Sequence, residues 1–160
     1  MRFTGCLERR NYTIWTVARI LAIDVGARRV GLAISDASRT LARPLETMAV
    51  ANEADAVDRV ARRIAELDGE DEGIGMIVVG MPSSLDGLPT PQTATVVAFI
   101  AQLTLRTRLP IATEDERLTS REAESRLAVR EKDWRKRKAR VDAVAASIFL
   151  QDFLDRTAHP

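Results

Sequence analysis

The sequence contains few of the residues that most often carry enzymatic chemistry. Its 160 residues include one cysteine, Cys6, and one histidine, His159, which precedes the C-terminal residue. With one cysteine there is no disulfide framework and no cysteine zinc site. With one histidine at the chain end, serine–histidine and cysteine–histidine catalysis are close to excluded. If the protein is an enzyme, carboxylates and a metal ion must carry most of its chemistry.

Long apolar segments are also missing from the sequence. No stretch approaches the roughly 20 apolar residues that cross a bilayer, and residues 1–19 lack the apolar core of a signal peptide. We therefore expect a cytoplasmic protein with no membrane partner. The hydrophobic share of 46% is sufficient for the core of one domain.

The small net charge of +1 conceals an uneven distribution. Between Arg117 and Arg140 there are ten Lys and Arg residues against four Asp and Glu, which leaves fourteen against nineteen in the rest of the chain. A local basic segment in an otherwise acidic chain favours one binding site for a polyanion.

Hydrophobic periodicity predicts three consecutive strands after a loose N-terminal extension of residues 1–18. Residues 19–24 and 30–34 form a predicted hairpin around the turn VGARR, and residues 42–49 form a third strand. Pro44 lacks a backbone donor, so this third strand suits a sheet edge.

The remaining elements are predicted to alternate between helices and strands. They are a helix capped by Asn52 over residues 53–69, a strand at 73–80, a helix at 93–107, a strand at 109–117, a helix at 120–130, an irregular basic loop at 131–138 and a final helix at 139–156. Antiparallel strands followed by βαβ units predict the α/β class, with a mixed sheet flanked by helices. We expect residues 19–156 to form one domain.

Carboxylates stand at the ends of several predicted elements. Asp24 ends the first strand, Asp115 and Glu116 end the last strand, and Asp142 lies near the start of the final helix. If Asp24 and Glu116 are on adjacent strands and Asp142 faces them, the three would repel one another without a divalent cation. Oxygen ligands without His or Cys favour Mg²⁺ or Mn²⁺. Such a site can activate water and stabilise the leaving oxygen in phosphodiester cleavage.

Each of these carboxylates also has an ordinary structural explanation. Strands often end in Asp or Glu where the chain emerges into water, and Asp142 could balance the helix dipole. Asp115 could form a surface ion pair with Arg117. Only the coincidence with the basic segment favours the metal site.

The basic segment offers candidate contacts for a nucleic acid. Arg117 could hold a phosphate with two hydrogen bonds or pair with Asp115 or Glu114. Trp134 could stack on an unpaired base or pack in the core. The remaining candidates are phosphate-binding cations, and the alternative is a solvated loop: Arg135, Lys136, Arg137, Lys138 and Arg140.

Four motifs of the chain resemble the YqgF/RuvX family of RNase H-like nucleases. They are ILAIDVGARRVGLAISD, IVVGMPSSLDG, EDERLTSREAE and KARVDAVAASIFLQDFL. They occur in the family's order and together cover residues 19–155, so the resemblance spans almost the whole chain outside the N-terminal extension.

The resemblance implies an RNase H-like fold and a metal-dependent nuclease. The family is linked to maturation of the 5′ end of pre-16S rRNA, and an older assignment makes its members Holliday junction resolvases. Its catalytic, metal-binding acidic positions correspond to Asp24, Glu116 and Asp142. Asp115 is a weaker candidate than Glu116, because neighbouring side chains of a strand point to opposite faces. The expected partners are structured RNA and branched DNA, and the expected state is a monomer or a homodimer.

Two functions of other classes also fit parts of the sequence. The segment DVGARRVGLAISD resembles the phosphate-binding hairpin of actin-like ATP-binding proteins, but 160 residues leave no room for the second domain they need. The other alternative is a non-catalytic RNA-binding protein, which would still bind RNA after replacement of the three carboxylates and would cleave no RNA with any metal.

Overall fold

A computed structural model describes residues 18–82, 88–115 and 134–158, with no account of the side chains of 134–139. The described strands are β1 (Arg19–Val25), β2 (Arg29–Ser35), β3 (Ala42–Ala49), β4 (Ile74–Met81) and β5 (Ile111–Asp115). The described helices are α2 (Glu53–Asp68), α3 (Pro91–Thr104) and α5 (Trp134–Ala158). The strands agree with the predicted ones to within a few residues at each end, and the mixed sheet confirms the predicted α/β class.

The five strands form one sheet in the order β3-β2-β1-β4-β5. The pairs β1–β2 and β2–β3 are antiparallel, while β1–β4 and β4–β5 are parallel. β3 is an edge strand, as the proline at position 44 predicted. β1, which carries Asp24, and β5, which ends at Asp115, are not adjacent, because β4 lies between them. A parallel connection must cross over the sheet, and here the crossover that follows β3 inserts β4 beside β1.

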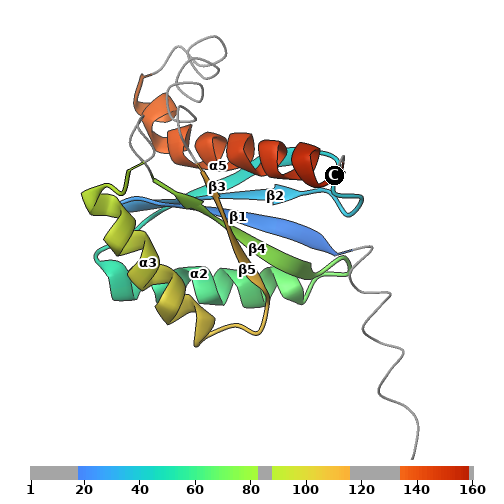
Figure 1. Ribbon diagram of the computed structural model, residues 1–160, viewed down its shortest axis with the longest axis horizontal. Helices are drawn as coiled ribbons and strands as arrows, with labels where there is room; N and C mark the ends of the chain where they lie inside the picture. The colour runs from blue at the N-terminus through green and yellow to red at the C-terminus, as the bar shows by residue number, and fades with distance from the viewer. Residues whose placement is uncertain (1–17, 83–87, 116–133, 159–160) are drawn as a thin grey trace, which may run out of the picture.

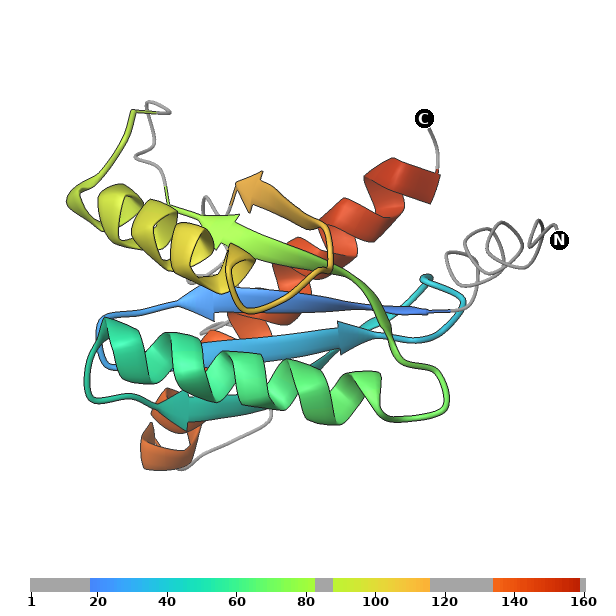
Figure 2. The same cartoon turned by 90° about the horizontal axis from the view of Figure 1, so that it is seen from below.

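Helices cover both faces of the sheet (Figure 1), with α5 on one face and α2 and α3 on the other. Viewed after a quarter turn, α2 and α3 lie in front of the strands and α5 crosses behind them (Figure 2). Alternating residues of each strand therefore enter two different cores. Ile20 and Ala22 of β1 pack with Phe149 of α5, whereas Leu21 and Ile23 pack on the side of α2 and α3.

Local sequence explains where α2 and α3 begin. The Asn52 side chain accepts a hydrogen bond from the Asp55 amide at 3.0 Å, so it caps α2 as predicted. α3 begins at Pro91, two residues before the predicted start, with a reciprocal capping box between Thr90 and Thr93. Proline is favoured in this first turn because its missing N–H has no intrahelical partner there.

The final helix begins earlier than predicted. Residues 134–138, predicted as part of an irregular basic loop, belong to the first turns of α5, which starts at Trp134 rather than Ala139. Lys and Arg are good helix formers and no Gly or Pro interrupts this stretch, so its charge was misleading evidence for a loop. Asp142 consequently lies two turns inside α5, and a role in balancing the helix start does not explain it.

Several predicted features lie outside the described residues. They are residues 1–17 of the predicted extension 1–18, the helix at 120–130 and the residues Glu116 and Arg117. Within the described ranges, no helix is long and apolar enough to span a membrane.

Candidate active site

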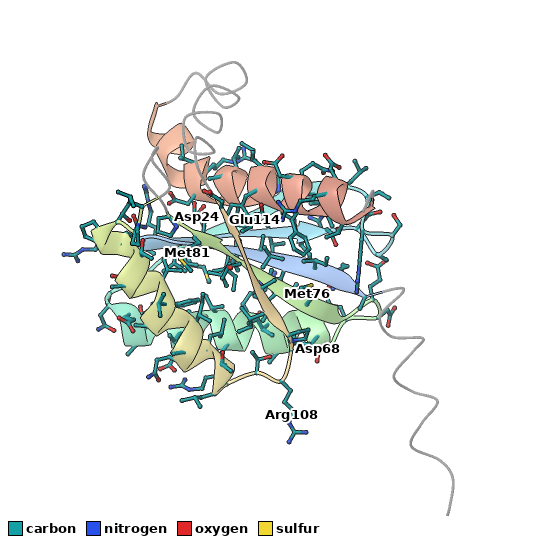
Figure 3. The ribbon with its side chains drawn as sticks, in the orientation of Figure 1. Asp24, Asp68, Met76, Met81, Arg108 and Glu114 are labelled. Atoms are coloured by element: carbon teal, nitrogen blue, oxygen red, sulfur yellow. The ribbon has the colours of Figure 1, made fainter. Side chains whose placement is uncertain are left out.

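The sheet register fixes the face on which Asp24 lies. Asp24 is opposite Gly31 in the antiparallel pair of β1 and β2, and it follows Ile20 and Ala22 at the two-residue period of a strand. Those two side chains contact α5, so Asp24 also points to the α5 face. Figure 3 shows Asp24 and Glu114 on this side of the sheet.

Gly31 allows α5 to approach this point of the sheet very closely. A Cβ atom on Gly31 would lie 2.2 Å from the carbonyl carbon of Asp142 and 2.6 Å from the amide nitrogen of Ala143. No real Cβ contact is that short, so only glycine fits here. As a result, the backbone of Asp142 lies over Gly31, which is opposite Asp24 in the sheet.

Asp142 is partly desolvated and paired with an arginine of β2. Arg29 Nε lies 2.9 Å from Asp142 Oδ2, and 23% of the Asp142 side chain is exposed. Within the described residues, Oδ2 is buried and makes no aligned hydrogen bond. Burial raises the pKa of Asp142 above its usual range, while the positive charge of Arg29 acts in the opposite direction. A carboxylate whose charged form is destabilised by burial is typical of a functional site.

A further carboxylate on the same face is buried. Glu114 of β5 is 7% exposed and accepts hydrogen bonds from both terminal nitrogens of Arg156, with Nη1 to Oε1 at 2.8 Å. In the register, Glu114 is beside Gly80 of β4. The preceding β4 residue, Val79, is opposite Ile23 of β1. Glu114 is therefore level with Asp24, two strands away, and anchors β5 to α5.

The described part of the structure brings together only some of the predicted acidic residues. Asp24 and Asp142 share one face around Gly31, while Glu116 is outside the described ranges. Asp115 is opposite Met81, whose side chain packs against the α2 and α3 core. Asp115 therefore points away from α5. In the ranges 18–82, 88–115 and 134–158, no group of three acidic, His or Cys side chains is arranged to hold a metal.

The predicted basic residues lie on one element where the structure describes them. Residues 134–138 form the first turns of α5, and Arg140 is exposed two residues before Asp142. These cations therefore precede the candidate catalytic carboxylate on the same helix.

Two residues of this face were missed by sequence reasoning. Arg29 was treated only as part of a turn, and Glu114 only as a possible partner of Arg117. Glu114 carried a detectable signal, because it alternates with Asp115 on a strand and must face the opposite side. Arg29 carried none, because its contact depends on how α5 crosses the sheet.

The donor set fits a hard divalent cation. Asp24 and Asp142 offer carboxylate oxygens on one face, and Oδ2 of Asp142 is buried with no aligned hydrogen bond within the described residues. Within the described residues these two acids have no His or Cys beside them that would favour a softer metal.

Comparison with known proteins decides the family. The family model described as "RuvX: Holliday junction resolvase" matches residues 18–156. The chain belongs to the RuvX family. RuvX relatives named "Putative pre-16S rRNA nuclease" include one from Roseiflexus sp., 40% identical over 86% of this chain and 94% of its own. Another from Leifsonia xyli is 44% identical over 84% of each chain.

Solved structures agree on the architecture of this RuvX member. T. thermophilus RuvC in complex with a Holliday junction substrate matches 89% of this chain and 96% of its own, with a TM-score of 0.53 and 15% identity. A further Thermus thermophilus RuvC structure gives a TM-score of 0.50 over 88% of this chain and 96% of its own. The fold is therefore the RNase H-like fold, as the sequence motifs predicted.

Proposed function

We propose that the protein is a metal-dependent nuclease that cleaves structured RNA, with the 5′ end of pre-16S rRNA as its substrate. The observation that carries the proposal is the approach of α5 over Gly31, which brings the partly buried Asp142 to the face of Asp24. The family membership and the names of the relatives support the substrate. The proposal places the protein in the cytoplasm.

Asp24, Asp142 and Glu116 would hold the cation, with Mg²⁺ or Mn²⁺ as the ions that fit carboxylate oxygens. We include Glu116 because side chains two residues apart on a strand share a face, and Glu116 is two residues beyond Glu114, which faces α5. A divalent cation bound by these carboxylates would stabilise the negative charge that develops on the phosphate during cleavage. Asp24 is in β1 and Asp142 is in α5, so the packing of α5 on the sheet sets the relative positions of these two acids.

The chain's own residues would bind and orient the nucleic acid. Arg140 is exposed in α5, ahead of Asp142, and can contact the phosphate backbone. We assign the same role of phosphate contact to the other cations of the basic segment: Arg117, Arg135, Lys136, Arg137 and Lys138. Trp134, which begins α5, would stack on an unpaired base. A helix with basic first turns and the partly buried Asp142 further along would hold the nucleic-acid strand next to the acidic site.

A cleavage assay with labelled pre-16S rRNA leader tests the proposal. Wild type and Asp24→Asn are compared in Mg²⁺ and then in Mn²⁺, and the variant should lose activity by roughly 10²–10³-fold, the scale of losing one electrostatic contact to a transition state. Equal activity of the two proteins would refute the assignment. Binding that persists without cleavage under either metal would favour a non-catalytic RNA-binding role.

Resolution of branched DNA is the second candidate, because the matching family model is described as a Holliday junction resolvase. A resolvase must cut two strands, so it is expected to act as a symmetric dimer. Junction DNA assayed beside the rRNA leader, with the oligomeric state measured by light scattering, separates the two functions. A strict monomer that cuts only RNA contradicts the resolvase.

A further inference from the structure

Two arginine–carboxylate pairs connect α5 to the sheet, and their geometries differ. Arg156 donates from both terminal nitrogens to the two oxygens of Glu114, the two-point arrangement that gives strong and specific pairing. Arg29 instead approaches Asp142 Oδ2 through Nε at 2.9 Å, and that buried oxygen has no aligned hydrogen bond within the described residues. The first pair is suited to a permanent connection and the second to one that can be exchanged.

Arg29 also supplies positive charge where acids are concentrated. It lies on β2 two residues before Gly31, so its side chain is on the α5 face with Asp142. Asp24 is opposite Gly31 on the same face. Two partly buried carboxylates so arranged destabilise each other unless a cation compensates them, and Arg29 provides that compensation from within the chain.

Arg29 is partly open to solvent. Its side chain is 34% exposed. Arg19 provides the contrast within the same sheet. Its side chain is 7% exposed and donates to the carbonyl oxygens of Leu67 and Gly73, which fixes it in place.

We propose that Arg29 is a positioning residue that acts as the counter-ion of Asp142 until a divalent cation replaces it. The inference rests on the proposed function, since it takes the acidic face as the cation site. In the metal-free protein, Arg29 holds the carboxylate and limits repulsion between the two aspartates. When the cation binds, the guanidinium gives up Oδ2 and becomes available to a phosphate oxygen of the substrate, for which arginine is well suited.

Titration of the full chain with Mn²⁺ by calorimetry tests this exchange. Removing a competing cation should strengthen metal binding, so we expect Arg29→Gln to bind Mn²⁺ roughly tenfold more tightly, which is about 1.4 kcal/mol. The same variant should melt at a lower temperature in EDTA, with the difference from wild type reduced at saturating Mn²⁺. Arg29→Lys should restore wild-type affinity because it keeps the charge. Arg28→Gln, which removes an exposed charge one residue earlier, is the matched control and should change neither quantity.

Unchanged or weaker Mn²⁺ binding by Arg29→Gln would overturn the exchange, as would an equal fall in melting temperature with and without metal. A merely structural arginine would give that second result. If the variant does not fold, the Nε–Hε resonance of Arg29 in the wild-type protein decides, because exchange requires it to shift on addition of Mg²⁺ and an unmoved resonance refutes it.

The titration also separates this inference from the proposed function. Wild type that binds no Mn²⁺, or Asp142→Asn that binds it as well as wild type, contradicts the metal site itself. Wild type that binds Mn²⁺ through Asp142, with Arg29→Gln no tighter, contradicts only the role of Arg29.

Discussion

The backbone of Asp142 occupies the space that a side chain on Gly31 would need. The distance from an added Cβ to the Asp142 carbonyl oxygen would be 2.3 Å. This contact couples the second strand of the first hairpin to a helix residue more than a hundred positions later in the sequence. The position of the candidate catalytic carboxylate therefore depends on the absence of a side chain on another element.

Gly31→Ala should accordingly be strongly destabilising. Overpacking a core costs about 1–3 kcal/mol, and we expect the upper end because the opposing atoms are backbone and cannot rotate away. The free energy of unfolding measured by urea denaturation checks this. Cleavage activity should fall as well, because α5 must shift and carry Asp142 with it. Gly69→Ala is the control, since its nearest neighbour would be an ordinary 3.4 Å away. A stability of Gly31→Ala within about 0.5 kcal/mol of wild type would contradict the close contact.

Removing Arg156 should lower the free energy of unfolding more than removing the charge of its partner Glu114. The Glu114 side chain is 7% exposed and that of Arg156 is 62% exposed. Arg156→Met leaves a buried carboxylate without its partner, which costs about 1–3 kcal/mol. Glu114→Gln leaves an arginine that water can solvate, so its cost should be smaller. Urea denaturation of both variants checks the order.

Arg59→Met provides a comparison for that pair, because Arg59 pairs with Asp55 one turn away on an exposed helix face. Such pairs contribute little to stability. Equal effects of Arg156→Met and Arg59→Met would show that the Glu114 pair does not anchor α5.

Acid should weaken the turn between β2 and β3 through Asp36. The Ser38 hydroxyl and the backbone amides of Leu41 and Thr40 donate to this carboxylate and hold the pKa of Asp36 well below its usual range. A pKa lower in the folded state than in the unfolded state gives stability that is complete above about pH 4 and is lost as the pH falls below it.

Asp36→Asn should therefore lower the melting temperature by no more than a few degrees at pH 7, because the carboxylate is near the surface. The difference between wild type and variant should narrow as the pH falls from about 4 toward 2. Asp71→Asn, in an exposed turn, controls for the loss of one charge. A difference that stays constant across this pH range would show that the hydrogen bonds of Asp36 are unimportant.

The sequence predicted the strands well because their signals are local. Ile23 and Val79 belong to continuous apolar runs, and both are fully buried in the centre of the sheet. Strand order was harder to predict, since nothing local indicates that β4 inserts between β1 and β5. The pairing of Arg29 with Asp142 is likewise a property of how α5 packs, and a charge pattern on one strand cannot reveal it. The early start of α5 was missed because dense positive charge was interpreted as a loop.

The choice between Asp115 and Glu116 as the third acid gives the sharpest test of the candidate site. Asp115 is opposite Met81 on the face of α2 and α3, whereas Glu114 faces α5. Continued alternation would put Glu116 on the α5 face, so we predict that Glu116→Gln reduces cleavage of the rRNA leader by roughly 10²–10³-fold. Asp115→Asn should keep most of the activity, and calorimetry should show weaker Mn²⁺ binding only for Glu116→Gln. The opposite result would mean that the strand changes its alternation after Asp115, as a bulge would cause.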